Sequence, residues 1–94
     1  MPAFAIIEIR ILEASTYQKY VDLVPEVIEK YGGRYLVRSS NVSSLAEGWK
    51  PDRIIVVEFS DMKSLSRCFN SEEYRKIAPL RENATESRAY IVED

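Results

Sequence analysis

The stretch AFAIIEIRI, residues 3–11, decides the fold because it is apolar on both of the faces that a β-strand presents. β-Branched residues dominate it, and successive side chains of a strand point to opposite sides of the sheet. The two faces are Ala5, Ile7, Ile9 and Ile11 on one side, and Phe4 and Ile6, followed by Glu8 and Arg10, on the other. Such a strand needs cover on both faces.

Three further strands are predicted farther along the chain. RIIVVEF, residues 53–59, is again apolar on both faces. GRYLVRSS, residues 33–40, alternates its side chains, and SRAYIVED, residues 87–94, supplies the last strand. Strict alternation in the second strand puts Arg34, Leu36 and Arg38 on one face and Tyr35, Val37 and Ser39 on the other.

Apolar residues at three- and four-residue steps predict a helix after the first strand. An apolar stripe runs from Tyr17 to Tyr31, opposite a charged and solvated face. Ser15 and Gln18 have the spacing of a capping box at the start of this helix. Pro25 lies inside the run and predicts a kinked or split helix, because proline lacks a backbone donor.

The second helical region falls into two parts. Ser60 or Asp61 is expected to cap a short first helix. Ser71 is a fresh N-cap for a second helix that begins at Glu72, and Pro79 interrupts the apolar line of that helix. The region therefore predicts two consecutive short helices before the last strand.

Two connecting segments need an interpretation of their own. Gly32 and Gly33 form either a phosphate-binding loop or the bend between a helix and a strand. Phosphate loops follow a strand and open a helix, so the bend that closes the helix is the interpretation that remains. The polar segment from residue 39 to 52 predicts a long loop, either irregular throughout or with a short hairpin arm at residues 42–45.

The order of the elements is β-α-β-β-α-β, which predicts one ferredoxin-like α+β domain over residues 1–94. Its four-stranded antiparallel sheet would carry the helices on one face. The other face would then expose a continuous apolar patch, which soluble monomers avoid. We therefore expect a homodimer in which two copies pack through this face as a dimeric α+β barrel.

Composition narrows the classes of function. The 15 acidic residues outnumber the 13 basic ones, and the resulting pI of about 5.2 is unlike that of nucleic-acid-binding proteins. The sequence has no apolar run of about 18 residues, so it predicts no membrane span. The first residues, MPAFAIIEIR, lack the basic leader of a secretion signal. Cys68 is the one cysteine and has no disulfide partner in the chain, so we expect a cytoplasmic protein without nucleic-acid or membrane partners.

The sequence contains no histidine, which removes the commonest general base and the commonest metal ligand. Catalytic triads that depend on histidine are thereby excluded. No metal-ligand spacing, nucleotide fingerprint or nucleophile motif is present, so we expect neither a metal nor a cofactor. Cys68 has no basic neighbour in sequence and is interpreted as a small core residue.

Three segments together resemble a known family. They are YGGRYLVR at residues 31–38, WKPDR at residues 49–53, and NSEEY at residues 70–74 with the later Arg81. Their combined spacing is similar to the family catalogued as domain of unknown function 1330, within the dimeric α+β-barrel superfamily. The resemblance covers Phe4 to Glu93. It implies two ferredoxin-like subunits packed sheet to sheet, each with a cleft between its sheet and its helices.

The superfamily includes cofactor-independent monooxygenases of aromatic polyketides, haem-degrading enzymes and lactone isomerases, whereas the family itself has no established activity. This sequence departs from the family pattern at two places. Cys68 and Phe69 stand where an aromatic pair is expected, and Ser71-Glu72-Glu73-Tyr74 replaces a serine-proline-glutamate-tyrosine run. A pocket lined by the missing aromatic residue is expected to be altered in this chain.

Charged side chains on the apolar strands are the first candidate site. Strand parity suggests that Glu8 and Glu58 point toward one interior, where Arg38 would be their partner. This set either orients an anionic or carbonyl-bearing ligand in an apolar cavity, or forms a structural ion pair. Arg81 lies on the apolar stripe of the last helix, where it either extends its head to water or binds a ligand carboxylate.

Four further residues are candidate ligand contacts. Asn70 lies at a helix start, where it serves either an anion site or helix capping. Trp49, in the polar loop, is either a lid or partner contact or packs beneath the loop. Tyr31 and Tyr74 either line a cleft or place their rings in the core, and the same alternative holds for Tyr17 and Tyr20.

Two functions remain open from the sequence. One is the binding of a small, partly apolar metabolite in a cleft, with Arg38, Glu58 and Arg81 as polar anchors. That protein is either a simple binder or a cofactor-independent enzyme of the monooxygenase or isomerase kind. The alternative is a non-catalytic dimeric module, in which the sheet face serves assembly and the polar residues are structural.

Overall fold

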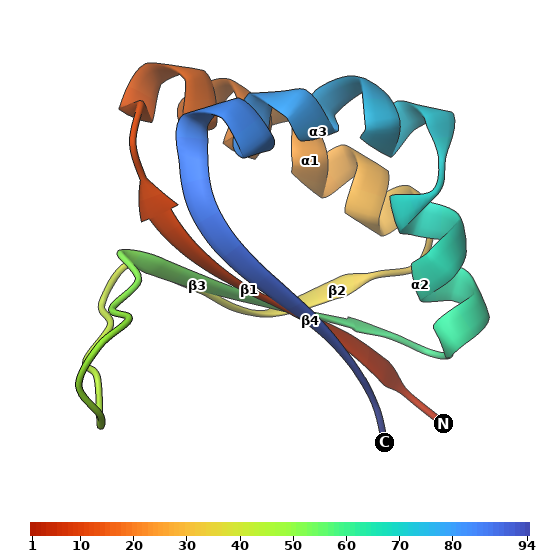
Figure 1. Ribbon diagram of the computed structural model, residues 1–94. Coiled ribbons are helices and arrows are strands. Elements are labelled where there is room, and N and C mark those ends of the chain that lie inside the picture. The colour runs from red at the N-terminus through yellow and green to blue at the C-terminus, as the bar shows by residue number, and fades with distance from the viewer.

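The computed structural model describes residues 1–94 as a four-stranded antiparallel sheet with three helices on one of its faces (Figure 1). The elements are β1 (Ala3–Ile11), α1 (Ala14–Lys30), β2 (Arg34–Ser39), β3 (Arg53–Phe59), α2 (Met62–Phe69), α3 (Glu72–Ala84) and β4 (Thr85–Glu93). The strands lie in the order β2-β3-β1-β4, and every neighbouring pair is antiparallel. The predicted ferredoxin-like α+β fold is confirmed. No helix is both long enough and apolar enough to span a bilayer.

The core lies between the sheet and the helices. Along β1, Ala3, Ala5, Ile7 and Ile9 are buried beneath the helices, and the residues between them are only half-buried. α1 contributes Tyr17, Tyr20, Val24 and Ile28 to the core, and α2 contributes Leu65 and Cys68. The apolar side chains that recur every 3.6 residues along the helices thus pack against those that recur every two residues along the strand, and together they form one core layer.

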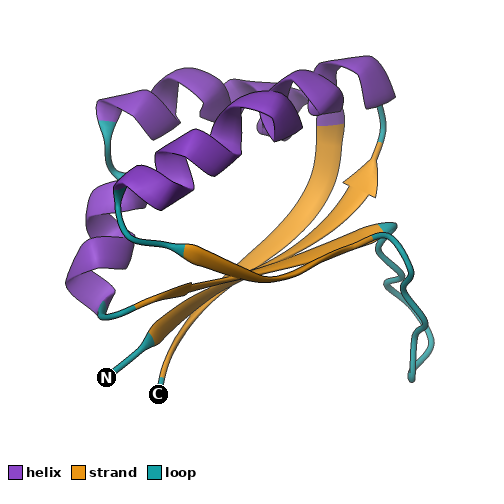
Figure 2. Cartoon of the chain, turned by 180° about the vertical axis from the view of Figure 1, so that it is seen from behind, coloured by secondary structure: helices purple, strands orange, loops and turns teal.

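The other surface of the sheet, here called the open face, carries no helix (Figures 1 and 2). One row of paired residues crosses all four strands there: Val37, Val56, Ile6 and Tyr90. Val37 is 41% exposed and Tyr90 is 48% exposed. An apolar band therefore runs across the middle of the open face, as expected from the two-sided apolar character of β1 and β3.

The start of α1 differs from the prediction. Glu13 is the N-cap, and its carboxylate accepts hydrogen bonds from the Thr16 amide and from the hydroxyls of Ser15 and Thr16. The predicted capping box is wrong because the helix begins before Ser15, and Gln18 instead donates to Asp22 one turn later. α1 then continues without a break through Pro25, with buried residues on both sides of it.

The glycine pair closes α1 as predicted. Gly32 has a positive φ of 83°, and the amide of Gly33 donates to the Ile28 carbonyl at 2.9 Å. Gly33 is also a point of close approach, because a Cβ there would lie 2.6 Å from Ile28 Cγ2 and 2.9 Å from the Phe59 ring. The pair therefore brings the end of α1 down onto β3 and launches β2.

A β-bulge in β2 breaks the predicted alternation. Tyr35 pairs with Val57 and Val37 pairs with Val56, so that Leu36 is an extra residue. Arg38 pairs with Ile55 and consequently shares the helix side of the sheet with Tyr35. The prediction that Arg38 lies on the same face as Arg34 is therefore wrong.

The segment between β2 and β3 is an irregular loop that extends beyond the open face, away from the helices (Figures 1 and 2). It forms no strand, so the hairpin arm predicted at residues 42–45 is absent. Its end is fixed to β1, since the Asp52 carboxylate accepts from the Ile11 amide at 2.9 Å and the Asp52 amide donates to Ile9.

The second half follows the prediction more closely. Asp61 caps α2 by accepting from the Ser64 amide, and Ser71 caps α3 by accepting from the Tyr74 amide. α3 continues through Pro79 to Ala84, although an interruption was predicted. β4 then begins at Thr85, two residues earlier than the predicted strand.

Candidate functional site

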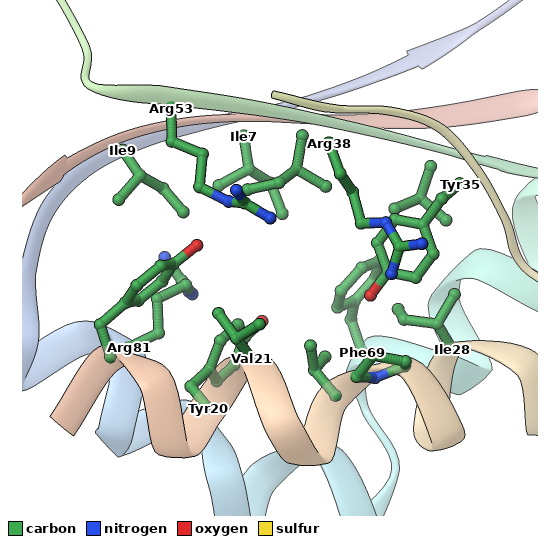
Figure 3. Close-up of a pocket in the computed structure, with 15 residues that line it drawn as sticks. Ile7, Ile9, Tyr20, Val21, Ile28, Tyr35, Arg38, Arg53, Phe69 and Arg81 are labelled. Carbon is green, nitrogen blue, oxygen red and sulfur yellow. The ribbon is translucent and has the colours of Figure 1, made fainter. Parts of the chain in front are cut away.

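A cavity lies between the sheet and the helices (Figure 3). Its volume is about 40 Å³, which is room for roughly three or four waters. It is lined by Ile7, Ile9, Tyr17, Tyr20, Val21, Val24, Pro25, Ile28, Tyr35, Arg38, Arg53, Ile55, Val57, Phe69 and Arg81. Most of the wall is apolar, so the few polar groups in it determine what the cavity can bind.

Three arginines from three different elements enter this space: Arg38 from β2, Arg53 from β3 and Arg81 from α3. Figure 3 shows their side chains reaching the cavity from different sides. No aspartate or glutamate is among the lining residues, and none of the three arginines takes part in an ion pair. The cavity is therefore positively charged without an internal counter-charge.

Arg53 and Arg81 are incompletely satisfied inside the protein. Arg81 donates to the Ser87 hydroxyl at 2.8 Å, and Arg53 makes a long contact of 3.4 Å with the Ser40 hydroxyl. The Tyr74 oxygen also neighbours Arg81, and the Tyr17 oxygen neighbours Arg53. The Nε atoms of both arginines are buried and have no hydrogen-bond partner. Buried polar atoms in proteins nearly always have a partner, so these two donors are exceptions that the chain itself does not satisfy.

Arg38 stands at the mouth of the cavity, because it is the one lining residue that is exposed. Its guanidinium lies over the Tyr35 ring, 4.2 Å from the ring centroid. The bulge at Leu36 is responsible for this arrangement, since it brings Arg38 and Tyr35 to the same side of the sheet. Stacking leaves the donors in the plane of the guanidinium available to a ligand.

Tyrosine hydroxyls supply the remaining polar groups. Burial raises the pKa of Tyr35 to about 12, and burial also raises the pKa of Tyr17, against the opposing charge of Arg53. The Tyr20 hydroxyl lies 3.0 Å from that of Tyr74, and burial strongly raises the pKa of Tyr20. These phenols are therefore protonated at neutral pH and act as hydrogen-bond donors, not as bases.

The charge of Arg81 is retained despite its partial burial. Burial opposes the charged form, but the neighbouring Tyr74 and Tyr20 oxygens act the other way, and the net pKa of the guanidinium is raised. Arg81 therefore presents a full positive charge to the cavity.

The structure separates the predicted site residues. Arg38 and Arg81 line the cavity, but Glu58 lies on the open face and pairs with Arg34 at 2.7 Å. The predicted partnership of Glu58 with Arg38 is wrong because the two side chains lie on opposite faces of the sheet. Glu8 is also on the open face, where its carboxylate accepts from the Trp49 indole nitrogen at 2.9 Å.

The other candidates lie outside the cavity wall. Trp49 is held against the open face between the guanidinium groups of Arg10 and Arg88, at 4.9 and 4.5 Å from its ring. Asn70 ends α2, where its side-chain amide donates to the Ser66 carbonyl. Tyr31 donates to Glu73 on the surface. Tyr74 does not line the cavity, but it contacts three residues that do: its hydroxyl pairs with that of Tyr20, its ring packs against Phe69, and its oxygen neighbours Arg81.

Sequence reasoning missed Arg53 and Tyr35. It named Tyr17 and Tyr20 as residues that line either a cleft or the core, and both line the cavity. A signal for Arg53 existed, because it has the same strand parity as Ile55 and Val57, which face the helices. No such signal existed for Tyr35 and Arg38 together, since the bulge that unites them has no mark in the sequence. Cys68 is buried in the core as predicted, and burial raises the pKa of its thiol to about 11.

Comparison with known proteins gives one family match. The sequence pattern of the family described as Domain of unknown function (DUF1330) matches residues 2–94. No curated protein matches the chain.

Several solved structures share the fold. The RPA0582 protein of unknown function from Rhodopseudomonas palustris has a TM-score of 0.85 at 17% identity, covering 99% of this chain and 82% of that one. A dimeric ferredoxin-like protein of unknown function from Jannaschia sp. CCS1 has a TM-score of 0.76 at 7% identity, covering 100% of both chains. SnoaB, a cofactor-independent oxygenase from Streptomyces nogalater, has a TM-score of 0.69 at 8% identity, covering 99% of this chain and 92% of that one. At these identities the likeness shows the fold alone.

Proposed function

The chain belongs to the family described as Domain of unknown function (DUF1330), and from this premise we propose that it binds a small, partly apolar anion in the cavity between its sheet and its helices. The observation that carries the proposal is the presence of three lining arginines and no lining carboxylate. A cation in an apolar wall is unfavourable unless an opposite charge or sufficient hydrogen bonds accompany it. A ligand anion supplies both.

The dimensions of the cavity set the size of the ligand. A cavity volume of about 40 Å³ restricts the ligand to a small compound with no more than a single ring. Its apolar part would lie against the aliphatic wall, while its charged group meets Arg53 and Arg81. Arg38, the exposed residue of the set, would contact the part that remains nearest to solvent.

We also propose that the functional unit is a homodimer formed through the open face. The apolar band of Val37, Val56, Ile6 and Tyr90 is continuous across the sheet, and large apolar patches on soluble proteins mark interaction sites. The rows beside the band are mixed: Arg34 and Glu58 continue into Phe4 and Val92 on one side of it, and Ile54 lies beside Glu8 on the other. The proteins of this fold that are described as dimeric support a second copy as the partner.

Isothermal titration calorimetry with benzoate and with benzamide, its uncharged counterpart, tests the binding proposal. We expect benzoate to bind and benzamide to bind at least about tenfold more weakly, because only benzoate forms charge-assisted hydrogen bonds. Arg81→Gln and Arg53→Gln should each weaken benzoate binding by about tenfold or more. Arg75→Gln, on the exposed surface of α3, is the matched control and should change nothing. The proposal would be contradicted if the two compounds bound equally well, or if neither bound.

A more specific version of the proposed function is that the bound anion is a substrate and that the protein catalyses its reaction without a cofactor. Fixed guanidinium groups in an apolar site stabilise negative charge that develops on a bound substrate, as monooxygenase-type and isomerase-type reactions through an anion require. SnoaB supports this form only by analogy of fold. Substrate-dependent oxygen uptake or isomerisation that Arg81→Gln abolishes would support it. If the protein formed dimers but did not bind benzoate, the alternative function, a non-catalytic dimeric module, would remain.

A further inference from the structure

We infer that the cavity takes a phenol or an enol as its conjugate base and lowers the pKa of the hydroxyl that it binds. This inference rests on the proposed function, because it assigns the chemical class of the anion in the same cavity. It goes further by stating that the protein shifts a protonation equilibrium of its ligand.

The balance of charge around the cavity gives the direction of the shift. Arg38, Arg53 and Arg81 face the space, and no carboxylate lines it to cancel their charge. An opposite charge within about 4–6 Å favours the ionised form of an acid by roughly 1–3 pKa units. Burial in an apolar wall acts against ionisation, but here it is opposed by three cations and not by one.

Hydrogen bonding acts in the same direction as charge. The Nε atoms of Arg53 and Arg81 are buried donors without acceptors, so an oxyanion satisfies both better than a neutral hydroxyl does. Tyr17 and Tyr35 are protonated at neutral pH, as tyrosines ordinarily are, and burial raises the pKa of each phenol further. They can therefore donate to the oxyanion and do not compete with the ligand for the positive charge.

The proton must leave the protein. The lining residues include no aspartate, glutamate or histidine, and the protonated phenols are poor acceptors. On ionisation the O–H bond of the ligand breaks, its electron pair stays on the ligand oxygen, and the proton passes to water or buffer. Arg38 marks the open side of the cavity, where solvent can accept it. No oxidant, reductant or cofactor is needed for this step.

This chemistry separates phenols and enols from carboxylic acids. A carboxylic acid is already ionised at neutral pH, so the cavity would bind it without changing its charge. A phenol arrives mainly neutral, which eases its passage through the apolar wall, and acquires its charge beside the arginines. The ligand class that exploits both features of the site is therefore a weak oxygen acid on a small, flat, apolar frame.

Spectrophotometric titration of 4-nitrophenol tests the inference, because its phenolate absorbs visible light and its neutral form does not. Equilibrium dialysis at each pH measures how much of the probe is bound, independently of its charge. With the unaltered protein in excess, we expect the apparent pKa of the bound probe to fall by about one unit or more. Arg53→Gln and Arg81→Gln should each reduce that shift, and Arg75→Gln should leave it unchanged.

Each outcome has a separate meaning. Binding by dialysis with an unchanged or raised pKa would overturn this inference while leaving the proposed function intact. If neither 4-nitrophenol nor benzoate bound, both this inference and the proposed function would be overturned. Arg53→Lys guards against loss of folding, because it keeps the positive charge at the same place on β3. A lysine variant that retains much of the shift, beside a glutamine variant that loses it, would support the inference. Equal shifts in the two variants would overturn it.

Discussion

Arg34 and Glu58 form an ion pair across the β2–β3 ladder, with 2.7 Å between Nη2 and Oε1, on the face of the sheet opposite Arg38. This pairing removes Glu58 from the set of carboxylates that could neutralise the cavity. Two arginines form ion pairs, Arg34 with Glu58 and Arg10 with Glu86, whereas the arginines that line the cavity form none. Arginine–carboxylate pairing therefore takes place on the open face of the sheet and is absent from the cavity.

Arg34→Ala should have a small effect. An exposed ion pair contributes about 0–1 kcal/mol to the free energy of unfolding, so we expect a loss within that range in urea denaturation. Binding of benzoate should be unchanged, since Arg34 does not reach the cavity. A loss of benzoate binding as large as that caused by Arg81→Gln would contradict the assignment of the two faces.

The buried hydroxyl pair of Tyr20 and Tyr74 should be coupled. Tyr74→Phe leaves the Tyr20 hydroxyl without its partner, which should reduce the free energy of unfolding by about 1–3 kcal/mol. Because Tyr20→Phe in the same chain removes the orphaned group, the double variant should lose less than the sum of the single losses. A double-mutant cycle by denaturant unfolding measures this, and strict additivity would show that the hydroxyls do not interact.

Gly33→Ala should destabilise the protein by about 1–3 kcal/mol, because the new Cβ overpacks the junction of α1 with β3. The clash involves Ile28 Cγ2 at 2.6 Å and the Phe59 ring at 2.9 Å. Gly32→Asn is the control, since its position is open and asparagine tolerates a left-handed conformation. Thermal unfolding should rank Gly33→Ala well below Gly32→Asn, and the reverse order would contradict the close approach.

Stability should fall in acid partly through Glu73. Hydrogen bonding, chiefly from Lys30, lowers the pKa of this carboxyl from 4.5 to about 2. Because the pKa is lower in the folded state, the contribution is complete above about pH 4.5 and is lost as the pH falls toward 2. Glu73→Gln should flatten the stability profile in this window, measured by urea unfolding. Glu29→Gln, on the exposed surface of α1, should keep the slope of the unaltered protein.

Val56→Lys should disrupt the proposed dimer, because it places a charge in the middle of the apolar band. Light scattering at micromolar concentration should give the mass of two chains for the unaltered protein and of one chain for the variant. Leu23→Lys, at a 48% exposed position on α1, is the matched control and should remain dimeric. A single-chain mass for the unaltered protein would refute the dimer.

The sequence predicted the elements well because their patterns are local. The two-sided apolar character of residues 3–11 and 53–59 indicated strands, and Ser71 and the glycine pair marked helix boundaries correctly. The capping of α1 was missed because glutamate at position 13 is an uncommon N-cap, whereas Ser15 matched a familiar spacing. The prolines did not break their helices, since tertiary packing on both sides of each outweighed local preference.

The site was less predictable than the fold. Arg38 and Arg81 were identified from the sequence, and the structure brings both to one cavity. Glu58 was assigned to the same interior by parity, and the bulge made that argument fail. Arg53 was overlooked because charged residues at strand ends usually face solvent. The distribution of charge between two faces of a sheet depends on register, which a single sequence specifies only indirectly.

The extra residue in β2 makes strand length a determinant of cavity charge. If Leu36 were deleted, β2 would become regular with Tyr35 and Arg38 still facing the helices, whereas a regular strand that keeps all of its residues would turn Arg38 outward. An insertion or deletion in this short strand can therefore add or remove a positive charge from the cavity without substituting any residue. When relatives are aligned across β2, the number of residues in the strand must be compared before an arginine there is assigned to the cavity.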